Sequence, residues 1–174
     1  MANKHAVVRT DRLTGTDDRA RLISVRYQPS GTMTAIENGN VVLVGELEAG
    51  ANVINREIFK GGTPTASSAL RDIVLIATPE VMYDERLRNL DEFINEAGKI
   101  SRGYRLHTHD VFSVTAEALV AADEDLLAKG SIVELMGGTK MKVVETATNG
   151  STTIGKIIDV NVVGRYTYYA IEVQ

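Results

Sequence analysis

Two histidines spaced two residues apart are the clearest candidates for chemistry in this chain. His107 and His109 lie in an alternating segment, residues 103–114, which is typical of a β-strand with one solvated face. Side chains two apart on a strand project from the same face, as paired imidazole ligands of a metal ion do. The only other histidine is His5, so a third ligand is not evident. Solvated or interfacial histidines are the alternative.

A second group of titratable side chains lies in a charged insert, residues 79–98. Paired carboxylates could supply a general acid and a general base. Here they are interleaved with Arg86 and Arg88, which is typical of a surface that faces solvent or a partner. The insert has apolar residues at helical spacing, with Asp84 as a possible cap, so a helix and an irregular lobe both remain open. The carboxylates are Asp84, Glu85, Asp91, Glu92 and Glu96.

The composition is that of an ordinary globular domain. The chain has 174 residues, of which 44% are hydrophobic and 24% charged, enough to bury one core. The absence of cysteine excludes disulfides, thiolate metal sites and thiol nucleophiles. No apolar run is long enough to cross a bilayer, and residues 1–5 do not resemble the start of a secretion signal. We expect neither a membrane partner nor a cofactor.

The charge is unevenly distributed along the chain. Residues 1–30 carry six basic and three acidic side chains, a net charge of +3, which leaves −7 for the remainder. The basic residues are spread out, lack interleaved aromatic residues and belong to an acidic protein that would repel phosphates, so we do not expect direct nucleic-acid binding. They predict an arm that docks onto an acidic protein surface. The candidate contacts are Lys4, Arg9, Arg12, Arg19, Arg21 and Arg26.

The elements that must position these residues are mostly strands. Short apolar or alternating runs separated by glycine turns predict a mainly β fold (β-rich α+β), an antiparallel barrel or sandwich with one or two short helices. We expect residues 1–33 to form an extended N-terminal arm and residues 34–174 a β-rich body that carries the insert. Residues 115–129 fit a short helix or turn. The expected strands are residues 19–27, 41–47, 53–59, 72–77, 103–114, 131–136, 139–146, 152–163 and 165–173.

Several short segments of the sequence together carry a resemblance to a known class of protein. They are Asn38-Gly39-Asn40-Val41-Val42, the run from Val74 to Glu85, Ala97-Gly98 with Arg102-Gly103-Tyr104-Arg105-Leu106, and Asp110-Val111-Phe112-Ser113-Val114-Thr115. This combination is similar to the capsid decoration, or head-stabilising (cement), proteins of tailed bacteriophages. The likeness covers most of residues 34–173 and is a pattern of strands and turns.

The resemblance implies a non-enzymatic virion protein with a β-rich body on the outside of the head. It also implies binding to the major capsid protein, self-association that is often trimeric, assembly in the host cytoplasm, and no catalytic residues. Another virion component, such as a head-fibre base or a tail protein, is the first alternative. A small β-barrel metal-binding enzyme that uses His107 and His109 is the second.

Overall fold

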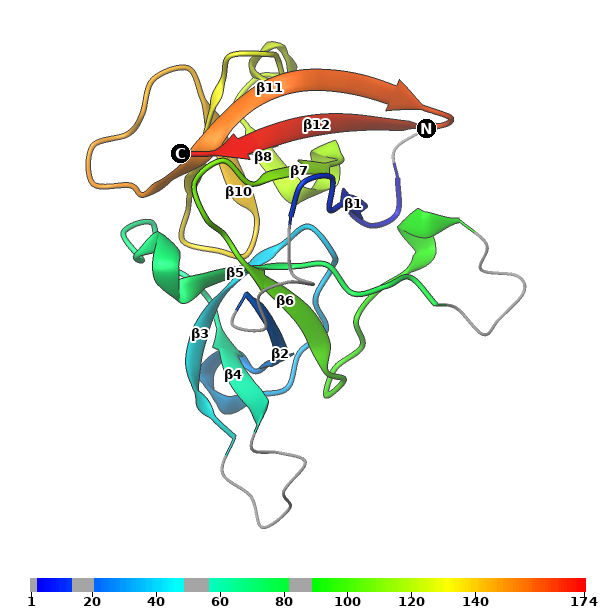
Figure 1. Ribbon diagram of the computed structural model, residues 1–174, viewed down its shortest axis with the longest axis vertical. Helices are drawn as coiled ribbons and strands as arrows, with labels where there is room; N and C mark the ends of the chain where they lie inside the picture. The colour runs from blue at the N-terminus through cyan, green and yellow to red at the C-terminus, as the bar shows by residue number, and fades with distance from the viewer. Residues whose placement is uncertain (1–2, 14–20, 49–56, 82–88) are drawn as a thin grey trace.

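The computed structural model describes residues 3–13, 21–48, 57–81 and 89–174 and contains two packed β units (Figure 1). One is a closed barrel of five strands, and the other is a sheet of seven strands. This arrangement confirms the predicted mainly β fold. Helical structure within the described ranges consists of short 3-10 turns, among them Leu90–Glu92 and Ala116–Ala118. None of the described helices has the length and apolarity that a bilayer-spanning segment requires.

The barrel contains the first half of the predicted body. Its strands follow one another in the order β2-β4-β3-β5-β6. All neighbours are antiparallel except β2 and β4, which run parallel. The bounds are β2 Leu22–Tyr27, β3 Val41–Leu47, β4 Ile58–Gly62, β5 Ile73–Ile76 and β6 Ser101–Arg105.

The seven-stranded sheet is built from the two ends of the chain. Its order is β1-β7-β12-β11-β9-β10-β8, antiparallel except for the β8–β10 pair. The chain therefore starts in the sheet, leaves it to form the barrel, and returns. The bounds are β1 Val8–Arg9, β7 Val111–Val114, β8 Leu119–Ala121, β9 Ile132–Leu135, β10 Met141–Val144, β11 Thr153–Val163 and β12 Tyr166–Val173.

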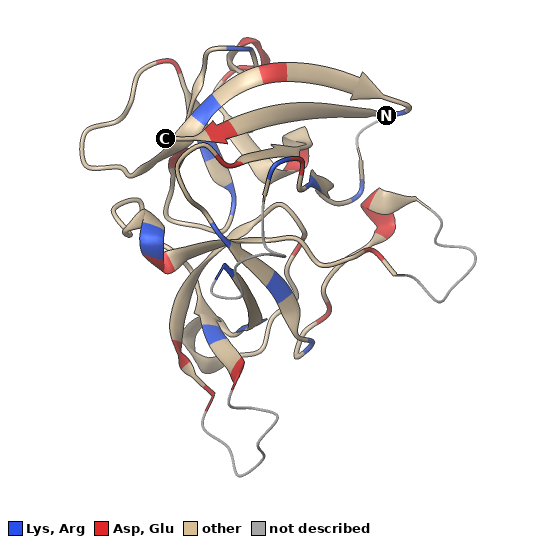
Figure 2. Cartoon of the chain, in the orientation of Figure 1, with Lys and Arg blue, Asp and Glu red and all other residues tan. Residues whose placement is uncertain are grey.

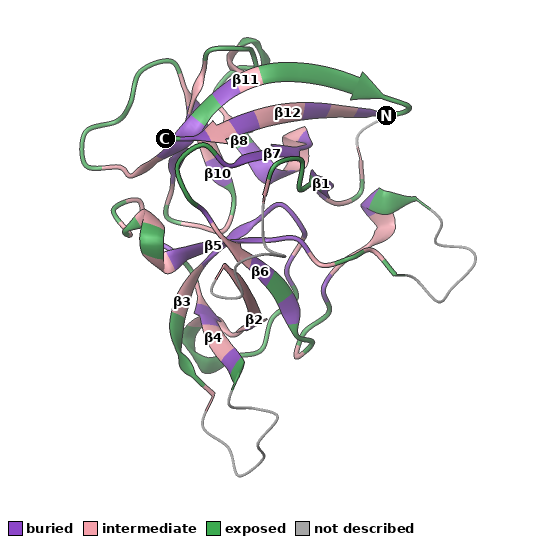
Figure 3. Cartoon of the chain, viewed as in Figure 1, coloured by how far each residue is buried: buried purple, intermediate pink, exposed green. Residues whose placement is uncertain are grey.

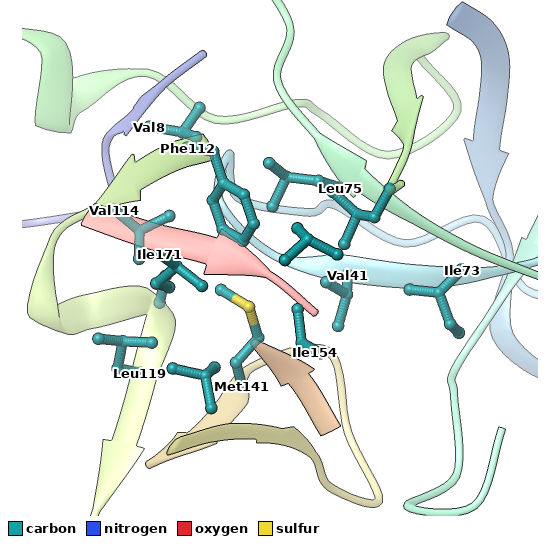
Figure 4. Close-up of a cluster of buried hydrophobic side chains, with 14 of the residues drawn as sticks. Val8, Val41, Ile73, Leu75, Phe112, Val114, Leu119, Met141, Ile154 and Ile171 are labelled. Carbon is teal, nitrogen blue, oxygen red and sulfur yellow. The ribbon is translucent and has the colours of Figure 1, made fainter. Parts of the chain in front are cut away.

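A shared core joins the barrel to the sheet, and β5 shows how. All four residues of β5 are buried, because Val74 and Ile76 point into the barrel while Ile73 and Leu75 pack against the sheet. A strand covered on both faces needs the uninterrupted apolar run that the sequence has here. Figure 4 shows Leu75 near Phe112 of the sheet, with Ile73 farther along the same cluster. The barrel and the sheet thus pack as one body.

The predicted boundary at residue 33 does not divide this fold. Residues 6–8 are buried, and β1 pairs with β7 at one edge of the sheet. Strand β2, which also lies before the boundary, pairs with both β4 and β6 and closes the barrel. The apolar side chains Val7, Val8 and Val25 explain this placement, since each is covered by the body. The described part of the N-terminal region is therefore integrated into the body.

The predicted strand over residues 103–114 is also two elements. Strand β6 ends at Arg105 in the barrel, and β7 begins at Val111 in the sheet. The turn between them is closed by Asp110, whose carboxylate accepts the backbone N–H of His107 at 2.8 Å. His109 takes a left-handed φ of 72°, which cannot occur within a strand. This segment carries the chain from one unit to the other.

Candidate interaction surface

The carboxylate of Asp91 joins three segments that are distant in sequence. It is buried and accepts the backbone N–H of Lys4 at 3.0 Å, the hydroxyl of Tyr166 at 2.9 Å and the guanidinium of Arg165 at 2.7 Å. Asp91 comes from the insert, Lys4 from the N-terminal segment, and the other two from the turn and first residue of the β11–β12 hairpin. One acidic side chain thus fixes these segments against one another.

The charged form of Asp91 is favoured. Burial raises the pKa of this carboxyl group, but the hydrogen bonds from Lys4 and Tyr166 and the positive charge of Arg165 outweigh burial and hold the pKa below the ordinary value of 3.8. Burial, together with the hydrogen bond to the negatively charged Asp91, raises the pKa of the Tyr166 hydroxyl. The site therefore holds a carboxylate and a neutral phenol at physiological pH.

This depressed pKa predicts acid sensitivity. Between the folded and unfolded pKa values the unfolded chain binds more protons at Asp91, so the contribution of this residue to stability is present above about pH 4 and is lost as the pH falls. We expect the stability difference between wild type and Asp91→Asn to be largest near neutral pH and to shrink below about pH 4. Urea unfolding from pH 7 to pH 3 measures it, and a difference that is independent of pH would contradict this assignment.

The basic residues predicted from the sequence fall into two groups. Arg21 and Arg26 form ion pairs within the body, with Asp110 at 3.4 Å and with Glu48 respectively. Lys4, Arg9 and Arg12 are exposed along the N-terminal segment, and Arg19 lies outside the described residues. Among the described residues of this set, Lys4, Arg9 and Arg12 are therefore the ones that present their charge at the surface.

Two exposed arginines lie over neighbouring tyrosine rings. The guanidinium of Arg9 is 5.1 Å from the ring centre of Tyr168, and that of Arg165 is 5.2 Å from the ring centre of Tyr166. The two rings are 6.1 Å apart, and Arg9 also pairs with Asp11 at 3.0 Å. We call Lys4, Arg9, Arg12 and Arg165 the basic ridge. Figure 2 shows basic positions beside β1 and at the tip of the hairpin.

No third ligand completes a metal site with the two histidines among the residues that the structure describes. His107 and His109 are exposed in the turn between β6 and β7, and the Nδ1 atom of His109 lies 3.5 Å from Glu172. His5 lies elsewhere, with its Nδ1 atom 2.9 Å from Glu37. No group of three or more His, Cys, Asp or Glu side chains in the described ranges is placed to hold a metal ion. The prediction that both histidines project from one face of a strand is wrong, because they lie in the turn between β6 and β7.

A cleft of about 490 Å³ separates β1 from the barrel. Its charged lining is balanced, with Arg9 and Arg102 facing Asp11 and Glu80. Arg9 of the basic ridge reaches this cleft, but the four charged side chains of the lining sum to no net formal charge.

Sequence reasoning missed a surface at the far end of β11. Residues 159–163 are all exposed, as the green stretch of this strand shows in Figure 3, and Val160, Val162 and Val163 are among the exposed large apolar residues. We call residues 159–163 the β11 edge. The signal in the sequence is three valines around Asn161 directly before the Gly164 turn. Valines in adjacent positions leave apolar groups on both faces of the strand.

Comparison with known proteins does not assign this chain to a family. No family model, no curated protein and no solved structure matches it. The functional argument therefore depends on the residues and contacts of this chain.

Proposed function

We propose that this chain is a non-enzymatic structural protein of a tailed bacteriophage that binds the outer surface of the capsid and stabilises or decorates the head. The partner is the major capsid protein, and the location is the capsid exterior. The sequence phrases described above support this proposal, and so does a rigid β body that presents fixed cationic side chains. The basic ridge is the observation that carries it.

The ridge is suited to binding an acidic protein surface. Arg9 and Arg165 lie over tyrosine rings and pair with carboxylates, so less side-chain entropy is lost when they meet a partner. Lys4 is held through its backbone at Asp91, and Arg12 through its backbone N–H to Val111 at 2.9 Å. Their charged ends remain at the surface of an otherwise acidic protein. Complementary charge of this kind favours encounter and orientation.

Charge reversal in the ridge tests the proposal. We expect Lys4→Glu combined with Arg12→Glu to reduce co-sedimentation with heads that lack this protein by at least about tenfold, a loss of about 1.4 kcal/mol in binding. Both side chains are exposed, so the fold should be retained. Deletion of residues 1–30 is not a clean test, because it removes β1 and β2.

The matched control is Lys129→Glu combined with Lys140→Glu. These lysines are also exposed, and the change in net charge is identical, but they lie on loops that precede β9 and β10. We expect this variant to bind heads like wild type. Equal losses in the two variants would show that only the total charge matters, and no binding by wild type would overturn the proposal.

A further inference from the structure

Among the described residues, no strand pairs with one side of the β11 edge. β11 pairs with β9 only as far as Lys156, and Ile157 then exchanges backbone hydrogen bonds with Gly130 and Ser131. Beyond a bulge between Ile157 and Asp159, the only neighbouring strand in the described chain is β12. The outer side of residues 159–163 therefore offers unpaired backbone groups.

The hairpin turn determines which backbone groups face outward. Gly164 and Arg165 form a two-residue turn, with a φ of 61° at Gly164, so Val163 and Tyr166 form the hydrogen-bonded closing pair. Bonded and non-bonded pairs alternate along an antiparallel ladder, so Asn161, opposite Tyr168, is also bonded to β12. The N–H and C=O groups of Val160 and Val162 therefore point away from β12.

The edge also lacks the features that usually prevent strand pairing. Exposed edges are commonly protected by lysine, by proline or by being very short. Residues 159–163 contain no lysine and no proline, and their only charged side chain is Asp159. Val162 is 68% exposed, the most exposed valine of the described residues. Such an edge is suited to accept another strand.

We propose that the β11 edge pairs with the same edge of a second copy of this chain, antiparallel about a two-fold axis at Asn161. Val160 of each copy then lies opposite Val162 of the other, and each pair exchanges two backbone hydrogen bonds through the outward-facing groups. Asn161 meets Asn161 in the non-bonded position. The valines on one face form a continuous apolar row across the two copies.

The order of residues favours a second copy over an unrelated strand. The Val-Asn-Val sequence is symmetric about Asn161, so the edge is complementary to itself in both side chains and backbone groups. Antiparallel pairing places the two Asp159 carboxylates at opposite ends, whereas parallel pairing in register would place them side by side. A two-fold contact closes on itself, so the assembly is a dimer and not the trimer expected from the sequence resemblance.

The mass of the purified protein in solution tests this inference without capsids and so independently of the proposed function. We expect light scattering after size-exclusion chromatography to give twice the mass of the 18.9-kDa chain for wild type. Val162→Lys should give the monomer mass, since a lysine on each copy would place two charges beside the apolar row. Val162→Pro should do the same, because it removes an outward-facing N–H that β12 does not use.

The matched control is Val81→Lys, since Val81 is 63% exposed but lies outside the sheet. This variant should remain a dimer, and circular dichroism should show that all variants keep their strands. A monomeric wild type, a trimer, or a dimer that survives both changes at residue 162 would overturn the inference. Loss of head binding by Val162→Lys together with a monomeric wild type would assign the edge to the capsid instead.

Discussion

Gly155→Ala is expected to cause the largest loss of stability among glycine-to-alanine substitutions at the described residues. Gly155 lies in β11 opposite Val173 of β12, and a Cβ atom at this position would lie 2.0 Å from the carbonyl oxygen of Glu172. The obstructing atom is backbone, and β12 is held between β11 and β7. Overpacking typically costs about 1–3 kcal/mol, and we expect this rigid contact to cost more than about 3 kcal/mol.

Urea unfolding followed by circular dichroism measures this effect. Gly137→Ala and Gly138→Ala are the matched controls, because a Cβ atom at either position meets nothing within 4 Å and neither glycine has a left-handed φ. We expect both controls to stay within about 0.5 kcal/mol of wild type. An unfolding midpoint for Gly155→Ala equal to that of the controls would contradict the close backbone contact between β11 and β12 at this position.

Asn38→Ala is expected to cost about 3–5 kcal/mol. The buried side-chain amide of Asn38 donates to the carbonyl of Thr78 at 2.8 Å and accepts the N–H of Thr78 at 3.0 Å. It also accepts from the amide of Asn95 at 3.0 Å and donates to Glu80 at 3.1 Å. Truncation leaves these buried or half-buried groups without partners, and each unsatisfied group costs about 1–3 kcal/mol.

The control for Asn38→Ala is Asn149→Ala. Both residues precede a glycine in a left-handed turn conformation, with φ values of 79° at Gly39 and 85° at Gly150, but Asn149 is exposed. We expect the control to cost less than about 1 kcal/mol in urea unfolding, because only local turn preference is affected. Equal losses would mean that turn conformation, and not the buried network, determines the effect.

These two asparagines show which features of the structure can be predicted from the sequence and which cannot. Both Asn-Gly pairs predict turns, and both occur in turns, but only the fold brings Asn38 next to Thr78, 40 residues away. The positions of strands, like those of turns, were predictable because they depend on residues that are neighbours in the sequence. Runs such as residues 41–47 and 152–163 carry apolar or alternating residues and end at turns, and they became β3 and β11. The predicted strand at residues 53–59 lies partly outside the described residues.

The assignment of strands to units was not predictable. The residue types of 103–114 keep the alternating pattern of a strand, although residues 107–109 are exposed in the turn between β6 and β7, so periodicity in the sequence does not reveal that turn. The basic residues present the same difficulty. The sequence predicts that Arg26 contacts an acidic partner surface, but in the fold Arg26 forms an ion pair with Glu48. Pairings between distant residues decide both cases.

The candidate surfaces depend on neighbours in the same way. The strand that contains the β11 edge was predicted, but its exposure follows from how short β9 is, which leaves the end of β11 without a neighbour. The capsid contacts of Lys4, Arg9 and Arg12 stay a prediction. Arg165 was not among the predicted contacts, because its place in the ridge depends on its contact with the Tyr166 ring and on Asp91, 74 residues away.

The two ends of the chain lie in one sheet, and this constrains how the protein folds as it leaves the ribosome. All five barrel strands have been synthesised by Arg105, so the barrel contains a complete set of local partners early. Val8 cannot pair until Val114 has been synthesised, and β7 in turn pairs with β12, which follows all the other described strands along the chain. Such late, non-local pairings slow folding. The nascent chain therefore carries β1 without its strand partner at least until β7 has been synthesised.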